Sequence, residues 1–179
     1  MPKLIYVATN FDNYRRARQF IAFFKSFDIV PSFDWTPFAD RIYANNLPRE
    51  TDHGELSRKA IFEVAGLETC AYLMVILPGG SGTNFELGVC YRRFIDRPES
   101  MYYPLPITIL DETPGSLVSF HHLPNINYTN SVAIAVTRVL KYFGVSDLEI
   151  GTALSSQAYS ELIRPSLESR TCDGPASSQ

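Results

Sequence analysis

The sequence feature that most constrains the fold is a run of seven apolar residues, AYLMVIL, at 71–77. A strand buried on both faces shows such a continuous apolar run, and strands of this kind occur in parallel sheets covered by helices. A helical pattern at 55–70 precedes the run, and the turn sequence PGGSG at 78–82 follows it directly. We therefore expect a central parallel strand that ends in a glycine-rich loop.

Strand and helix patterns alternate along most of the chain. Short apolar runs predict the strands, and apolar residues at helical spacing predict the helices between them. The predicted strands are 3–9, 28–35, 71–77, 105–110 and 125–128, and the predicted helices are 12–27, 55–70, 83–97 and 131–144. Pro31 favours an edge position or a short pairing segment for the second strand, and Gly144 is placed to close the last helix. We expect an α/β fold, a single-domain Rossmann-like or flavodoxin-like sandwich of about five parallel strands with helices on both faces.

Two further patterns concern the middle of the chain. From 36 to 54 the sequence is rich in Pro, Asn, Asp, Arg and His without a clear period, which predicts a long surface loop of the kind that usually serves a site. In the helix that follows, an apolar stripe is expected to face the core. Its members are Leu56, Ala60, Ile61, Val64 and Leu67.

Length and composition indicate one soluble domain. The chain has 179 residues, of which 45% are hydrophobic and 20% charged, which is ordinary for a globular protein. We expect a domain at 1–145, a helical extension of one helix at 146–164, and a polar, Ser-rich and disordered tail at 165–179.

Charge and cysteine content exclude several classes of function. The net charge of −3 argues against a nucleic-acid partner. The three cysteines form no C-x-x-C motif and have no histidine at ligand spacing, so neither a disulfide framework nor a metal site is indicated. No window approaches the ~18 apolar residues of a membrane span. We expect a cytoplasmic protein with no cofactor, no metal and no membrane contact.

The glycine-rich loop is the strongest candidate for a binding site. It lies where a parallel strand ends and a helix begins, so its free backbone amides and the helix dipole suit a phosphate or a sugar hydroxyl. Gly79, Gly80, Ser81 and Gly82 are the predicted contacts, followed by Thr83. No Gly-Lys-Ser/Thr follows the loop and no G-x-G-x-x-G is present, which argues against ATP and NAD.

Glu86, four residues after the last loop glycine, has two interpretations. In the first, TNFE at 83–86 is a capping box in which the Glu86 carboxylate reaches back to the amide of Thr83. In the second, the helix dipole keeps Glu86 ionised as a nucleophile, and the Tyr6 hydroxyl of the first strand orients it. For Tyr6 the alternative is a half-buried aromatic residue with its hydroxyl at the rim.

These segments resemble the nucleoside 2-deoxyribosyltransferase family and its nucleotide N-glycosidase relatives. The resemblance covers 3–144 and is carried by IYVATNFDN at 5–13, by EVAGLETCAYLMVILPGGSGTNFELG at 63–88 and by LPITIL at 105–110. It implies a homo-oligomer that acts on a nucleoside or nucleotide. In the implied reaction Glu86 displaces the base and forms a covalent deoxyribosyl-enzyme, Tyr6 orients Glu86, and 81–83 meet the 5′ end of the sugar.

The chain departs from the family pattern at three places. Glu63 and Tyr72 stand where family members often carry aspartates, and 78–80 lacks the aspartate that can hold the base. Glu63 is the candidate general acid, with a solvated helix carboxylate as the alternative. PGGSGTNFE also resembles the motif of the cytokinin-activating phosphoribohydrolases, although their upstream glycine motif is missing. A nucleoside 5′-monophosphate N-glycosidase and a non-catalytic nucleotide sensor are therefore the alternative functions.

Residues after the first two strands complete the predicted substrate site. Thr9 ends the first predicted strand, Asn10 and Phe11 follow it, and Asp34 and Trp35 end the second. In a parallel sheet these ends gather at the edge where ligands bind. The alternatives are helix capping by Asn10 and a core position for Trp35.

Overall fold

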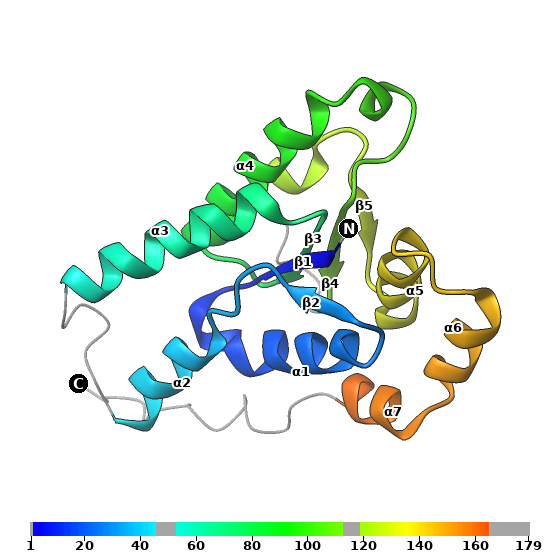
Figure 1. The fold of residues 1–179 in the computed structure, drawn as a ribbon, viewed down its shortest axis with the longest axis horizontal. Helices are drawn as coiled ribbons and strands as arrows, with labels where there is room; N and C mark the ends of the chain where they lie inside the picture. The colour runs from blue at the N-terminus through cyan, green and yellow to red at the C-terminus, as the bar shows by residue number, and fades with distance from the viewer. Residues whose placement is uncertain (1, 46–52, 113–118, 165–179) are drawn as a thin grey trace, which may run out of the picture.

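The computed structural model describes residues 2–45, 53–112 and 119–164 (Figure 1). Its centre is a sheet of five parallel strands in the order β2-β1-β3-β4-β5. The strands are β1 (Lys3–Ala8), β2 (Ile29–Pro31), β3 (Tyr72–Leu77), β4 (Ile107–Asp111) and β5 (Asn127–Thr129). This order is that of the flavodoxin-like doubly wound sheet, so the predicted fold class is confirmed.

Helices cover both faces of the sheet. The α-helices are α1 (Tyr14–Lys25), α2 (Thr36–Ala44), α3 (His53–Thr69), α4 (Ser81–Ile95), α5 (Val132–Tyr142), α6 (Asp147–Leu154) and α7 (Gln157–Ile163). Short 3-10 helices are η1 (Phe11–Asn13), η2 (Pro98–Met101) and η3 (Ser119–His122). Figure 1 shows α3 and α4 together on one side of the sheet, with α1 and α5 on the other. None of the helices in the described ranges is long and apolar enough to span a membrane.

The apolar run at 71–77 is the central strand of the sheet. Every residue of β3 is buried, and β3 pairs with β1 on one side and β4 on the other. β2, with Pro31 at its end, is an edge strand as predicted. Parallel pairing brings the ends of β1 and β3 to the same edge, where the amide of Asn10 donates to the carbonyl of Pro78 at 3.4 Å. The glycine-rich loop therefore lies beside the residues that follow β1.

The predicted loop at 36–54 is wrong at 36–44, which forms α2. Pro37 stands in the first turn of α2, where its missing N–H costs no helical hydrogen bond. The Asp34 carboxylate accepts from the amide of Thr36 at 3.1 Å and from its hydroxyl at 2.7 Å, which satisfies donors at the helix start. Residues 46–52 lie outside the described ranges, and α3 begins at His53.

The apolar stripe predicted for α3 does not face the core as a whole. Leu67 is buried, whereas Ile61 is 67% and Val64 40% exposed, and Phe62 beside them is 58% exposed. Only the last turn of α3 packs closely on the sheet side. There a Cβ on Gly66 would come within 2.6 Å of the Cβ of Phe33, so the absence of a side chain permits the contact.

The C-terminal extension contains two short helices rather than one. The Ser156 hydroxyl accepts from the amide of Tyr159 at 3.1 Å, so a new N-cap starts α7 after α6 has ended. Gly144, at φ 76°, closes α5 as predicted, and the amide of Val145 donates to the carbonyl of Leu140. The predicted disorder of 165–179 lies outside the described residues.

Candidate active site

A cavity of about 440 Å³ lies at the carboxyl edge of the sheet, at the junction of β1, β3, α3 and α4. Most of the residues predicted for the substrate site line it. They are Thr9, Asn10, Phe11, Trp35, Glu63, Gly79, Gly80, Ser81, Gly82, Thr83 and Glu86, and they are joined by Asp12 and Lys59. Two predicted residues lie outside the lining, Tyr6 and Asp34. The topology thus gathers four separate segments, 9–12, 35, 59–63 and 79–86, around one space.

Tyr6 lies directly behind this cavity and contacts its central carboxylate. The Tyr6 hydroxyl donates to Oε1 of Glu86 at 2.7 Å. Tyr6 is completely buried in β1, and burial together with the nearby Glu86 carboxylate raises the pKa of the phenol. The phenol therefore stays protonated and acts as a hydrogen-bond donor to Glu86.

The capping-box interpretation of Glu86 is wrong, because α4 begins two residues earlier than predicted. Its N-cap is Gly80, and the hydroxyl of Thr83 accepts from the amide of Gly80 at 3.2 Å. Thr83 is thus the third residue of the helix and itself caps the helix start. Glu86, one turn further on, is left to point toward β1 and Tyr6.

The same shift corrects the expected effect of the helix dipole on Glu86. Glu86 is the sixth residue of α4, and the field of a helix terminus falls off within the first turn. Burial instead raises the pKa of Glu86 to about 7, opposed by the hydrogen bond from Tyr6. The Glu63 carboxylate raises this pKa further, and the Lys59 ammonium opposes it. At neutral pH Glu86 is therefore divided between its protonated and ionised forms.

Glu63 and Lys59 face the cavity from α3 as an ion pair. They are four residues apart, on the same side of the helix, and the Lys59 ammonium donates to the Glu63 carboxylate. Both side chains are mostly shielded, at 17% exposed for Lys59 and 23% for Glu63. Lys59 was missed by the sequence reasoning. The signal that could have found it is its spacing of four residues before Glu63.

The residues after β1 form the wall opposite α3. Asn10 caps η1, since its side chain accepts from the amide of Asn13 at 2.8 Å, and it also lines the cavity. The Thr9 hydroxyl lies 3.5 Å from the carbonyl of Pro78 and accepts from the Asn13 amide group at 3.2 Å. These bonds hold the β1 and β3 loops against each other and shape the wall.

Aromatic side chains form the remaining side of the cavity. Phe11 stacks on Trp35, with ring centroids 6.2 Å apart and ring planes at 27°. Trp35 is almost fully buried, and its indole N–H donates to the carbonyl of Val7 at 2.9 Å, so it serves both the core and the cavity wall. Flat aromatic surfaces of this kind suit the face of a nucleobase. Asp34 is occupied in capping α2.

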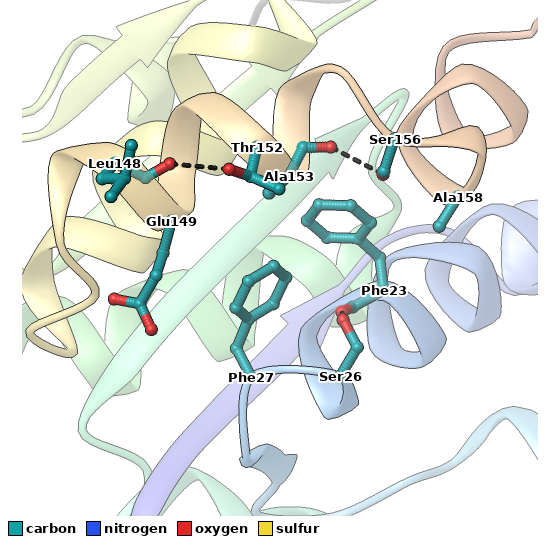
Figure 2. Close-up of a pocket in the computed structure, with 9 residues that line it drawn as sticks. All are labelled: Phe23, Ser26, Phe27, Leu148, Glu149, Thr152, Ala153, Ser156 and Ala158. Atoms are coloured by element: carbon teal, nitrogen blue, oxygen red, sulfur yellow. Dashed lines mark hydrogen bonds between the residues drawn. The ribbon is translucent and has the colours of Figure 1, made fainter.

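A second cavity, of about 450 Å³, lies between α1 and the helices α6 and α7 (Figure 2). Phe23 and Phe27 line it, and its hydroxyl groups donate to nearby backbone carbonyl oxygens. Thr152 donates to the carbonyl of Leu148 at 3.0 Å, and Ser156 donates to that of Ala153 at 2.6 Å, as drawn in Figure 2. Its carboxylate, Glu149, accepts from the amide of Ser146 at 3.0 Å and from the Ser146 hydroxyl at 2.5 Å at the start of α6, so this cavity presents mainly apolar surface.

The described part of the chain brings together no group of three or more His, Cys, Asp or Glu side chains that could hold a metal ion.

Comparison of the chain with protein-family models, curated proteins and solved structures finds no match. The case for a function therefore rests on the geometry of the cavity around Glu86.

Proposed function

We propose that the protein cleaves or transfers at the N-glycosidic bond of a nucleoside or nucleoside 5′-monophosphate. The observation that supports this most is the hydrogen bond from Tyr6 to Glu86 beside a glycine-rich helix start. Retaining cleavage at an anomeric carbon needs one carboxylate nucleophile held under an oxocarbenium-like carbon. A buried tyrosine that fixes one carboxylate oxygen supplies that orientation.

In the proposed reaction the second oxygen of Glu86 attacks C1′ of the sugar. Among the described residues, the Glu86 carboxylate accepts a hydrogen bond from Tyr6 alone, through Oε1, which leaves Oε2 for the attack. The Oε2–C1′ bond forms as the C1′–N bond to the base breaks, and the base leaves with a proton. Water or a second base then attacks C1′ and releases Glu86.

Protonation of the leaving base is assigned to the pair of Glu63 and Lys59. Lys59 is the cationic side chain among the described residues of the lining, and its ion pair with Glu63 fixes its position. The Lys59 ammonium carries the proton of the pair, so it can pass that proton to the base directly or by way of the Glu63 carboxylate. The aromatic wall of Phe11 and Trp35 offers a surface on which the base can stack.

The charge of the lining favours a neutral nucleoside over its 5′-monophosphate. Glu86, Glu63 and Asp12 contribute carboxylates, whereas Lys59 contributes the cation and already pairs with Glu63. A phosphate would therefore meet negative charge on the α3 side, although the amides at the start of α4 suit an anion. A sugar hydroxyl accepts from the same amides without that repulsion.

We also propose a cytoplasmic homo-oligomer. Ile61 and Phe62 on α3 and Phe85 on α4 are each more than half exposed, and α3 and α4 pack side by side next to the cavity. Exposed large apolar side chains on neighbouring helices favour association with a second copy. Cys70 and Cys90 are free thiols, which fits the reducing environment of the cytoplasm. Sedimentation or light scattering of the purified protein tests the assembly.

The decisive experiment combines turnover with trapping of the intermediate. Wild type is incubated with nucleosides and with 5′-monophosphates, with and without an acceptor base, beside the variants Glu86→Gln and Glu68→Gln. We expect Glu86→Gln to lose activity at least about a thousandfold and the exposed control Glu68→Gln to keep it. A 2-fluoroarabinosyl nucleoside should leave a covalent adduct on Glu86, located by peptide mass spectrometry. Full turnover by Glu86→Gln would overturn the assignment, and binding of nucleosides without turnover by wild type would favour the non-catalytic sensor.

A further inference from the structure

Two cysteine thiols meet behind the proposed active site. Cys70 stands between the end of α3 and the start of β3, and Cys90 lies in α4. Their sulfur atoms are 3.8 Å apart, and both residues are completely buried. The two sulfurs also share the carbonyl oxygen of Leu67, at 3.4 Å from Cys70 and 4.0 Å from Cys90. The pair is therefore held in contact by three different elements.

Arg93 brings a positive charge to one of the two sulfurs. Its guanidinium donates to the carbonyl oxygens of Leu67 and Cys70, which fixes its position, and one of its nitrogens lies 3.6 Å from the Cys70 sulfur. A hydrogen bond from Cys90 and the charge of Arg93 lower the pKa of Cys70, whereas donating that bond raises the pKa of Cys90. Because Arg93 lies beside Cys70, Cys70 is the more readily ionised of the two thiols.

We propose that Cys70 and Cys90 form an oxidation site at which hydrogen peroxide produces an intramolecular disulfide. The Cys70 thiolate attacks one peroxide oxygen, the O–O bond breaks, and the products are a Cys70 sulfenic acid and hydroxide. The Cys90 sulfur then attacks the Cys70 sulfur and displaces a second hydroxide. The two thiol protons convert both hydroxides to water, so two thiols and one peroxide become one disulfide and two waters.

The geometry requires only a small movement for this bond to form. The sulfurs are already in van der Waals contact, and they must approach from 3.8 Å to about 2.05 Å. Because both sulfurs are buried, peroxide reaches them only during local opening, so the reaction is slow compared with that of an exposed thiol. Cys90 lies one turn after Glu86 on α4, so the disulfide would tie that helix to the start of β3.

Counting free thiols after oxidation tests the proposal on the full chain. The sequence contains three cysteines, Cys70, Cys90 and Cys172, so the reduced protein should take up three maleimide groups after unfolding. After treatment with hydrogen peroxide it should take up one, and the digest should contain a linked peptide pair with Cys70 and Cys90. Uptake of three groups, or a disulfide that involves Cys172, would overturn the proposal. Cys172→Ser is the matched control and should still form the disulfide.

Single variants separate the two sulfurs and the role of Arg93. In Cys90→Ser the Cys70 sulfenic acid has no partner and should be labelled by dimedone, whereas Cys70→Ser should show no label on Cys90. Loss of a neighbouring cation shifts a pKa by ~1 unit or more, so Arg93→Gln should oxidise about tenfold more slowly and Arg93→Lys much less so. Circular dichroism and melting curves show which variants are folded. A label on Cys90 in place of Cys70, or an unchanged rate in folded Arg93→Gln, would contradict the assigned roles.

Discussion

Replacing Glu86 by glutamine should stabilise the protein, and the gain should grow with pH. Burial raises the pKa of Glu86 from its reference of 4.5 to about 7. The native state therefore binds this proton more tightly than the unfolded chain does. Stability from this group is fully present below pH 4.5 and is lost as the pH rises through 7, because the native carboxylate must then ionise in a shielded site.

The size of this change in stability follows from the difference between the pKa values of Glu86 in the unfolded and native states. Each pKa unit corresponds to about 1.4 kcal/mol, so complete ionisation of Glu86 costs the native state about 3 kcal/mol. Glutamine does not titrate, and its amide oxygen can still accept from Tyr6. The free energy of unfolding of Glu86→Gln minus that of wild type should therefore rise by about 3 kcal/mol between pH 4.5 and pH 8.5.

Urea unfolding of both proteins at a series of pH values measures this difference. Every other titrating group is common to the two chains, so their contributions cancel in the subtraction. The exposed residue Glu68 provides the control, and Glu68→Gln should show a difference that changes by less than about 0.5 kcal/mol. A difference for Glu86→Gln that stays flat, or falls as the pH rises, would refute the burial and the raised pKa on which the reasoning rests.

Three further predictions follow from contacts of the same structure. Tyr6→Phe removes a hydrogen bond that lowers the pKa of Glu86. In the proposed N-glycosidic reaction, the pH midpoint of activity should therefore move upward from about 7. An unchanged midpoint would contradict that contact. Gly66→Ala should lower the free energy of unfolding in urea by about 1–3 kcal/mol, because its Cβ would meet a neighbouring side chain at 2.6 Å. The control Gly88→Ala, whose Cβ would meet nothing within 4 Å, should raise it by up to about 1 kcal/mol. Equal effects of the two variants would refute the packing. The buried guanidinium of Arg16 donates to the carbonyl of Leu162 in α7 and to the carboxylate of Glu112 after β4. Arg16→Met should therefore lower the free energy of unfolding in urea by about 2 kcal/mol. An unchanged free energy of unfolding would show that these bonds are not formed.

Local patterns in the sequence were sufficient to predict the parallel sheet and to place the glycine-rich loop at its carboxyl edge. A short continuous apolar run between turn residues is typical of a strand buried on both faces, a proline without an N–H suits an edge, and a glycine with positive φ closes a helix. The segments 71–77, Pro31 and Gly144 all behave in this way. Because the carboxyl ends of parallel strands share one edge, the placement of the glycine loop beside the residues after β1 followed as well.

The sequence did not predict α2 or the correct start of α4, because the local residue patterns favoured other structures there. The segment 36–44 carries Pro37 and several polar residues, and it becomes helical because Asp34 satisfies its first donors and its apolar side packs on α1. The start of α4 was placed two residues too late, since Thr83 suits either the N-cap or the third helical position. That choice depends on where β3 ends and how its loop packs against Asn10.

The sequence by itself determined that a glutamate follows a glycine-rich loop at the mouth of a parallel sheet, because spacing and periodicity are properties of neighbouring residues. Only the tertiary structure decided which side chains surround that glutamate. Tyr6 and Glu86 are 80 residues apart, and Glu63 and Lys59 reach them from a third segment. The pKa of Glu86 depends on how much water these side chains exclude and on the charges they place nearby, and no local pattern encodes either quantity.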